Sequence, residues 1–323
     1  MIDARNLSRR YGGKLAVNNL SFTVVPGRVT GFVGPNGAGK STTMRLIVGL
    51  DRPDSGEVMI DGRLYRDLAL PLRSVGALLE AQAVHKGRSA RNHLLCLAQT
   101  QGLPARRVDE VISVAGLRAV AMKRAGGFSL GMGQRLGIAA ALLGNPRMLL
   151  LDEPVNGLDP EGVLWIRNLM KQLAAEGRTV FVSSHLMNEM AVTADHLIVI
   201  GRGRLLADCS MQEFIDRYSA SQVLVKTADA VRLSDLVEVE GGQVLRESSD
   251  TLVVSRMPAP RIAELAARAG LVVYELTPQR GSLEEAFLEL TAASLEYGDH
   301  DAAAATGSGA LSSQVGPSGR NAS

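Results

Sequence analysis

Short apolar segments rich in β-branched residues alternate with amphipathic segments over about the first 219 residues. Buried parallel strands are apolar runs and their crossover helices are amphipathic, so this alternation predicts an α/β domain with a largely parallel sheet over residues 1–219. Residues from about 85 to 144 instead show one helical pattern after another, which predicts a helical insert in this domain. The expected strands are at residues 21–25, 29–33, 75–79, 148–151, 179–183 and 196–200.

A second pattern begins near residue 222, in the order strand, helix, strand, strand, helix, strand. This order predicts a small α+β, ferredoxin-like accessory domain over residues 220–297, which ends with a helix at 282–296. Residues 298–323 are mainly Ala, Gly and Ser without periodicity, and they carry too little apolar surface to offset the entropy of ordering. We therefore expect a disordered tail. The expected elements of the accessory domain are at 222–227, 231–239, 243–247, 251–256, 260–269 and 271–277.

The overall charge is nearly balanced, with 35 basic and 33 acidic residues and a net charge of +2. A protein that binds polynucleotides by counterion release carries a larger positive excess, so we expect no nucleic-acid partner. The longest apolar run, residues 136–144, has about half the length of a membrane-spanning helix. We therefore expect a cytoplasmic protein that reaches a membrane only through a partner.

A glycine-rich loop lies between the expected strand 29–33 and an expected helix over residues 40–50. Its pattern, G-x4-G-K-[ST], is that of a phosphate-binding P-loop, in which backbone N–H groups and a helix N-terminus meet phosphate oxygens. We expect Lys40 to reach the β- and γ-phosphates of ATP, Ser41 to ligate Mg²⁺ and Thr42 to bond an α- or β-oxygen. A chance glycine-rich turn is the alternative, and the flanking strand and helix argue against it. The predicted ATP-binding loop consists of Gly34, Pro35, Asn36, Gly37, Ala38, Gly39, Lys40, Ser41 and Thr42.

An acid pair follows the apolar strand at 148–151. Asp152 is suited to hold Mg²⁺, and Glu153 to polarise the water that attacks the γ-phosphate. A strand that ends in two acids is common, but ligands of open α/β sheets bind at the carboxyl edge, where the P-loop also lies. The shared edge favours the functional interpretation of both acids.

The segment Phe128-Ser129-Leu130-Gly131-Met132-Gly133-Gln134-Arg135 precedes a long apolar helix. It resembles the signature motif of ATP-binding cassette (ABC) proteins, usually written L-S-G-G-Q. Ser129 and Gly131 match that motif, whereas Leu130 and Met132 stand where it has Gly and Gln. The resemblance covers about the first 215 residues and implies the fold of a P-loop NTPase, namely an ABC-type nucleotide-binding domain with a helical subdomain.

The resemblance also assigns three other residues, which occur in the expected order. It implies that Tyr11 stacks on adenine, that Asp159 lies in the D-loop and that His185 is the switch histidine at the γ-phosphate, so that Glu153 and His185 are the catalytic pair. Each has a structural alternative: Tyr11 as an ordinary aromatic, Asp159 as the N-cap before Pro160, and His185 as a structural histidine. The P-loop and the acid pair favour the functional roles.

One position departs from the family pattern. Where ABC proteins have the glutamine of the Q-loop, after the strand at 75–79, this chain has Glu80, with Gln82 two positions later. Either Glu80 approaches Mg²⁺ and water as an additional anion, or a shifted loop brings in Gln82. We favour Glu80 because it requires no shift of register.

The resemblance further implies partners. In this family the signature helix of one subunit closes over ATP on the P-loop of another, so Ser129, Gly131 and Met132 would contact ATP in a homodimer or in a dimer with a similar subunit. The chain resembles the ATP-binding subunits of bacterial multidrug and antibiotic-resistance exporters, which bind an integral-membrane permease. The permease would dock around residues 80–94 and hold the protein at the inner face of the cell membrane.

The rival interpretation is a soluble ABC ATPase that acts on ribosomes or DNA. Ribosomal members carry two cassettes, and DNA-repair members carry long coiled-coil or zinc inserts, neither of which this sequence shows. A cassette that only binds ATP is disfavoured by Glu153. The sequence therefore predicts an ATPase that uses ATP and Mg²⁺ to drive a membrane transporter, most simply an exporter.

Overall fold

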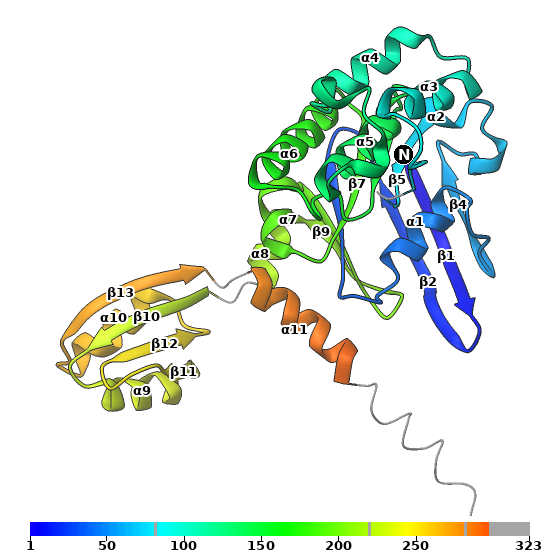
Figure 1. The fold of residues 1–323 in the computed structure, drawn as a ribbon. Helices are drawn as coiled ribbons and strands as arrows, with labels where there is room; N and C mark the ends of the chain where they lie inside the picture. The colour runs from blue at the N-terminus through cyan, green and yellow to red at the C-terminus, as the bar shows by residue number, and fades with distance from the viewer. Residues whose placement is uncertain (81–82, 219–220, 281–282, 297–323) are drawn as a thin grey trace, which may run out of the picture.

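A six-stranded sheet forms the centre of the computed structural model, which describes residues 1–80, 83–218, 221–280 and 283–296 (Figure 1). Its first five strands are parallel and the last is antiparallel to its neighbour. The predicted α/β fold is confirmed, and each predicted strand of this sheet ends within one residue of the observed end. In spatial order the strands are β5 (Val75–Leu78), β6 (Met148–Leu151), β7 (Thr179–Ser184), β3 (Val29–Val33), β8 (His196–Gly201) and β9 (Arg204–Ser210).

A second, antiparallel sheet packs on one face of the first, in the order β2-β1-β4. Only its segment 21–25 was predicted as a strand. The reason is that several register shifts interrupt the pairing of β1, and Asn6 and Asn19 adopt positive φ angles of 49° and 51°, which breaks the period of two. The strands of this sheet are β1 (Ile2–Tyr11), β2 (Lys14–Val24) and β4 (Ser55–Ile60).

Three phenylalanines join the two sheets. The ring centroids of Phe22 and Phe32 are 5.6 Å apart, and that of Phe181 lies 5.7 Å and 5.0 Å from these two. Aromatic pairs at this separation add to the free energy gained by burying their surface. The α1 helix (Lys40–Ile47), which follows the P-loop, packs into the same core, so this core holds the loop's flanking elements in place.

Helices cover the opposite face of the six-stranded sheet and form the larger core. The region predicted as a helical insert contains α3 (Ala90–Thr100), α4 (Ala105–Val114) and α5 (Leu130–Leu142), with two short 3₁₀ turns between them. The other helical elements of the first 218 residues are η1 (Tyr65–Asp67), α2 (Pro71–Ser74), η2 (Arg118–Val120), η3 (Ala125–Gly127), α6 (Pro160–Ala175), α7 (Met187–Thr193) and α8 (Met211–Tyr218).

The close approach of α5 to β5 yields a stability prediction. A Cβ atom at Gly76 would overlap the carbonyl oxygen of Ala141 and lie 2.8 Å from Cγ of Pro146. We expect Gly76→Ala to lower the free energy of unfolding by about 1–3 kcal/mol, as for other overpacked sites, measured by urea denaturation. Gly13→Ala is the control, because a Cβ atom there meets no atom within 4 Å. Equal stability of the two variants would contradict the packing argument.

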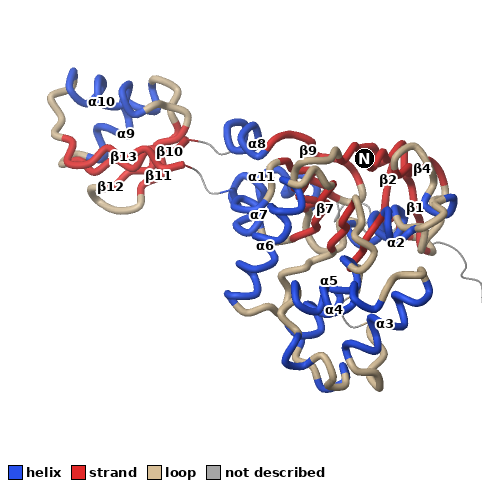
Figure 2. Tube along the Cα trace, turned by 90° about the horizontal axis from the view of Figure 1, so that it is seen from above, coloured by secondary structure: helices blue, strands red, loops and turns tan. Residues whose placement is uncertain are grey.

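The C-terminal sheet has the strand order β11-β12-β10-β13, and its pairs are antiparallel. Figures 1 and 2 show this sheet as a separate lobe, with both of its helices on one face. Side chains of the helices and strands share one apolar core. The element order is that of the split β-α-β arrangement. The elements are β10 (Ser221–Thr227), α9 (Ala230–Val239), β11 (Gln243–Arg246), β12 (Thr251–Ser255), α10 (Ala259–Arg268) and β13 (Val273–Arg280).

The last helix, α11 (Leu283–Glu296), packs against α7 and α8 of the first domain. Ala286 and Phe287 are buried in the core of that domain, and Nδ2 of Asn188 donates a 2.7 Å hydrogen bond to Oε1 of Glu284. We predicted this helix as part of the accessory domain, whereas its buried side chains join the first domain. The tail at 298–323, which we expected to be disordered, lies outside the described residues.

Candidate nucleotide-binding and catalytic site

The predicted site segments meet at one edge of the six-stranded sheet. Strands β3, β6 and β7 are parallel neighbours, with Val33 paired to Ser184 and Leu151 paired to Val182. The P-loop, the acid pair and His185 follow directly after these strands. Because parallel strands end at a common edge, segments far apart in the sequence come together there.

The P-loop needs glycine at two positions for its shape. Gly37 and Gly39 have φ angles of 80° and 106°, which strain any residue with a side chain, and a Cβ atom at Gly39 would overlap the carbonyl oxygen of Ala16. The α1 helix begins at Lys40 with no acidic residue in its first turn and no side-chain hydrogen bond at its N-cap. Its first N–H groups are therefore available to an anionic ligand.

Lys40 is the buried cation of the site. Its Nζ donates a 2.7 Å hydrogen bond to the carbonyl oxygen of Gly34 and lies 3.6 Å from Oε1 of Glu153. Burial lowers the pKa of Lys40, and the negative charges of Glu153 and Asp152 partly oppose this effect. A buried ammonium group beside two carboxylates is suited to exchange its protein partner for a phosphate oxygen.

Glu153 connects Lys40 with His185. Its Oε2 lies 2.8 Å from Nδ1 of His185, while its Oε1 faces Lys40. The backbone at Glu153 has a φ angle of 48°, which is unusual for a residue with a side chain and is found at functional sites. The structure thus places the three residues predicted from separate motifs in direct contact.

Two residues that were not predicted as part of the site hold the acid pair. The Ser183 hydroxyl donates to Oδ1 of Asp152 and accepts a 2.9 Å hydrogen bond from the Glu153 N–H. The side-chain amide of Gln134 donates to the Glu153 carbonyl oxygen at 3.2 Å. Ser183 ends the strand predicted at 179–183, and Gln134 belongs to the segment that resembles the signature motif, so no separate signal marked either residue as part of the site.

The P-loop borders a cleft of 350 Å³. Lys14 and Ala16 at the start of β2 also line it, and both were missed because no motif distinguishes them from the rest of that strand. The lining includes Asn36, Gly37, Gly39, Lys40, Ser41, Thr42 and Glu153.

Tyr11 does not line this cleft in the described part of the chain. Its hydroxyl donates a 2.6 Å hydrogen bond to Oδ2 of Asp51, and the Arg9 guanidinium carbon lies 4.8 Å from its ring centroid. Tyr11 as a residue is 44% exposed. Tyr11 sits opposite Lys14 in the β1–β2 hairpin, so the aromatic ring lies next to a residue that does line the cleft.

The signature and D-loop residues cap helices. Ser129 accepts a 3.3 Å hydrogen bond from the N–H of Met132 at the start of α5, and Asp159 accepts one of 2.9 Å from Gly162 at the start of α6. The two segments contact each other, since a Cβ atom at Gly131 would lie 2.9 Å from the Gly157 carbonyl oxygen. None of the described residues of either segment lines the P-loop cleft. The structure therefore leaves these predicted site residues apart from the P-loop of their own chain.

Glu80 lies two residues beyond the end of β5, at the same sheet edge as the acid pair, and its side chain is exposed. The N–H of Asp152 donates a 2.8 Å hydrogen bond to the carbonyl oxygen of Leu78, which aligns the ends of β5 and β6. The alternative residue, Gln82, lies outside the described residues. The choice between them stays a prediction in favour of Glu80.

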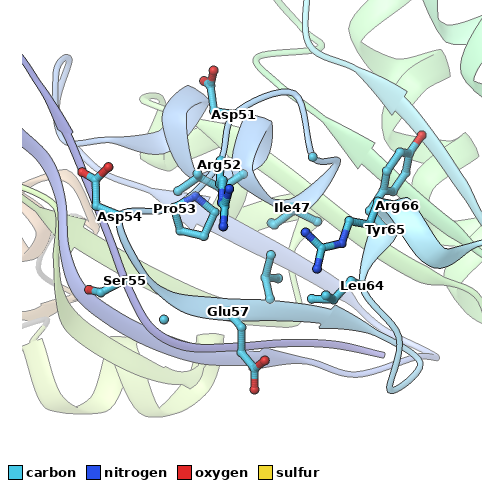
Figure 3. A pocket seen from close by; sticks show the side chains of 14 residues that line it. Ile47, Asp51, Arg52, Pro53, Asp54, Ser55, Glu57, Leu64, Tyr65 and Arg66 are labelled. Atoms are coloured by element: carbon cyan, nitrogen blue, oxygen red, sulfur yellow. The ribbon is translucent and has the colours of Figure 1, made fainter.

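A cavity of 460 Å³ lies between α1, β4 and η1, away from the P-loop (Figure 3). Its floor is apolar, with Ile47 and Leu64, and Arg52 and Arg66 stand on opposite sides of it. No residue of the predicted site lines this cavity. Volume alone therefore does not identify the functional site, which is marked instead by its converging charged groups.

Comparison with known proteins decides the family. A family model described as "ABC transporter" matches residues 17–156. The bacitracin transport ATP-binding protein BcrA of Bacillus licheniformis is 34% identical over 296 residues, which cover 90% of this chain and 97% of that protein. The chain belongs to the ABC transporter ATP-binding proteins. This ABC protein is therefore an ATPase that serves as the nucleotide-binding subunit of a transporter.

Other relatives and solved structures agree with this assignment. The ABC protein is 33% identical over 308 residues to an uncharacterized ABC transporter ATP-binding protein, YhcH, of Bacillus subtilis, covering 93% of this chain and 99% of that one. The dimeric structure of MJ0796, an ABC transporter cassette, matches with a TM-score of 0.61 and 28% identity over 65% of this chain and 99% of that chain. A family model for a domain of unknown function (DUF8746) matches residues 221–284.

None of the described helices of this ABC protein is both long and apolar enough to cross a membrane.

Proposed function

We propose that this protein hydrolyses ATP at the Lys40, Glu153 and His185 site to energise export through a separate integral-membrane permease. The observation that carries the proposal is the continuous contact from Lys40 Nζ to Glu153, at 3.6 Å, and from Glu153 to His185, at 2.8 Å. These contacts support the roles of Lys40 as the phosphate-binding cation, Glu153 as the catalytic acid and His185 as the switch histidine.

Each of the three residues has a distinct role in the proposed reaction. Lys40 binds the β- and γ-phosphates, and Glu153 orients the attacking water and accepts its proton. His185 holds Oε2 of Glu153 and senses the γ-phosphate. Negative charge on the phosphates replaces Oε1 of Glu153 as the partner of Lys40, which frees Oε1 for water.

The donors at the site are compatible with Mg²⁺. Ser41 lines the cleft, and Asp152 has one carboxylate oxygen bonded to Ser183 and the other free of any described hydrogen bond to a side chain. Mg²⁺ prefers oxygen ligands and is usually bound by one or two carboxylates together with substrate phosphates. We propose Ser41 and Asp152 as its ligands, with Glu80 nearby. The bound ion would neutralise charge that develops on the phosphates.

We infer that the working unit is a dimer, either of two copies or of this chain with a similar subunit. Ser129 caps the start of α5, which contains the signature residues Gly131 and Met132, and the D-loop residue Asp159 caps the start of α6. None of these four residues lines the cleft of its own chain. An uncovered helix N-terminus with a serine cap is suited to the γ-phosphate of an ATP held by another subunit. One solved relative is titled as a dimeric post-hydrolysis state bound to ADP and Pi, at 26% identity and a TM-score of 0.60.

The proposed cargo class follows from the relatives' names. They include a bacitracin transport protein, a Nod factor export protein of Rhizobium and a lantibiotic transport protein of Streptococcus pyogenes. We propose an exporter of the antibiotic-resistance type whose permease selects the cargo and docks around residues 80–94. This docking would place the protein on the cytoplasmic face of the membrane. We further propose residues 1–219 as the ATPase domain, to which the returning helix α11 adds its apolar face, and residues 221–280 as the accessory lobe.

Co-purification tests the transporter assignment. We expect the tagged protein, expressed in its native host and extracted in mild detergent, to be recovered with a membrane protein of several apolar spans, because the ATPase acts through the permease. The measurement is mass spectrometry of the purified complex. An untagged strain controls for background binding. Recovery with ribosomes, and without a multispan protein, would reverse the assignment.

A further inference from the structure

Two buried side chains hold the backbone of Glu153 from opposite ends of its residue. Ser183 Oγ accepts a hydrogen bond from the Glu153 N–H at 2.9 Å, and Gln134 Nε2 donates one to the Glu153 carbonyl oxygen at 3.2 Å. Ser183 is 0% exposed and Gln134 3% exposed. Buried polar groups in folded proteins nearly always have hydrogen-bond partners. Ser183 and Gln134 find theirs in the backbone of Glu153.

These two hydrogen bonds stabilise an unusual backbone conformation of Glu153. Its φ angle of 48° lies in the left-handed region, which is unfavourable for a residue with a side chain and persists only where the surroundings enforce it. The direction of the carboxylate, between Lys40 and His185, depends on this backbone conformation. Groups that fix the flanking N–H and C=O therefore fix the position of the catalytic acid.

Ser183 also connects the two acids. A hydroxyl group can donate one hydrogen bond and accept two, and the Ser183 hydroxyl donates to Oδ1 of Asp152 while it accepts from Glu153. The acid proposed to hold Mg²⁺ and the acid proposed to orient water are thus oriented by one atom. Loss of that atom would free both acids together.

Gln134 connects Glu153 to the signature helix. It lies on α5, five positions after Ser129, which caps the start of the same helix. In the proposed dimer, that start contacts the ATP bound by the other subunit. A movement of α5 toward this ATP would therefore be transmitted through the Gln134 amide to the Glu153 backbone of its own subunit.

We propose that Ser183 and Gln134 are positioning residues for hydrolysis: Ser183 orients Asp152 and Glu153, and Gln134 couples Glu153 to the nucleotide of the second subunit. This inference rests on the proposed role of Glu153. It assigns functions to two side chains that do not touch the nucleotide themselves. Hydrolysis in one half of the dimer depends, through Gln134, on occupancy of the other half.

Ser183→Ala tests the first part on the full chain in its native transporter. We expect kcat to fall by about 10- to 100-fold because the acids lose their orientation, with KM for ATP within about twofold of the unchanged value. Ser183→Thr keeps the hydroxyl and should restore most of kcat. The matched control is Thr30→Val on the neighbouring strand β3, where the hydroxyl is also buried but has no hydrogen-bond partner in the described chain. This control should leave kcat unchanged.

Gln134→Met tests the second part, because Met keeps the length of the side chain and removes the N–H donor. We expect kcat to fall by about tenfold and the Hill coefficient for ATP to move toward one, since the two sites no longer communicate. An exposed exchange on α6, Gln172→Met, is the control and should keep the native coefficient.

The outcomes separate this inference from the proposed function. The positioning role is overturned if Ser183→Ala and Gln134→Met lower only the melting temperature and leave kcat and the Hill coefficient at their native values. In that case an inactive Glu153→Gln variant still supports the proposed site. Full turnover of Glu153→Gln overturns the proposed site itself.

Discussion

We expect ATP binding to be lost when Lys40 is replaced by Ala. The Nζ atom is held at the P-loop by the Gly34 carbonyl, whereas Lys14, the other basic residue that lines the cleft in the described chain, belongs to the start of β2. Hydrogen bonds to charged groups contribute about 1.5–3 kcal/mol each, so losing two phosphate contacts should weaken binding by at least about 100-fold. Titration with a fluorescent ATP analogue measures this change.

The fold should tolerate the Lys40→Ala exchange. Burial lowers the pKa of Lys40, which means that the folded state disfavours its charged form and gains no stability from that charge. Removal of the lysine should therefore leave the melting temperature close to native. Lys171→Ala, an exposed exchange on α6, is the control and should bind ATP normally. Normal nucleotide affinity of Lys40→Ala would remove the P-loop assignment.

We expect Glu153→Gln to slow ATP hydrolysis by about 100- to 10,000-fold, because this is the usual contribution of a general base to the rate. ATP should still bind. The amide keeps the size and backbone of Glu153 but cannot accept a proton from water. ATP-bound subunits should then accumulate as a stable dimer, because the step that opens the dimer no longer occurs. Phosphate release and size-exclusion chromatography with ATP and Mg²⁺ measure the two effects.

Glu264→Gln serves as the control for this exchange, since Glu264 is an exposed acid on α10 of the accessory lobe. It should hydrolyse ATP at the native rate and form no trapped dimer. Undiminished turnover of Glu153→Gln would move the base to another residue. Slow turnover without a trapped dimer would instead contradict the proposed closure over two nucleotides.

The accessory lobe is connected to the first domain at both of its ends. The chain leaves the first domain after α8, forms the four-stranded sheet, and returns to pack α11 on α7 and α8. The α7 helix begins two residues after His185. The lobe is thus attached to the first domain by α11, whose apolar side chains are buried in that domain's core against the helix that follows His185.

The predicted strands of the central sheet agreed closely with the structure because buried parallel strands are short, continuous apolar runs. The antiparallel sheet was largely missed for the opposite reason. Strand β1 is interrupted by bulges and exposes many polar side chains, so its alternation is weak. The last helix was assigned to the wrong neighbour, since an amphipathic pattern shows that a face is buried but not against which domain.

The sequence by itself determined the P-loop and the acid pair. The requirements of these elements are local: glycines at fixed positions, a lysine at a helix start, and acids directly after an apolar strand. The sequence also indicated that the P-loop and the acid pair share one edge of the sheet, because parallel strands have their carboxyl ends on the same side.

Only the tertiary structure decided which side chains hold these groups in place. Ser183 and Gln134 reach Glu153 from segments 30 and 19 positions away, and their contact depends on the pairing of β7 with β6 and on the packing of α5 against β5 of the same sheet. Lys14 and Ala16 line the cleft because the antiparallel sheet places the start of β2 beside the P-loop. A serine, a glutamine and an alanine have no distinctive pattern in sequence. Their roles depend on where they lie in the folded protein, and long-range packing sets that location.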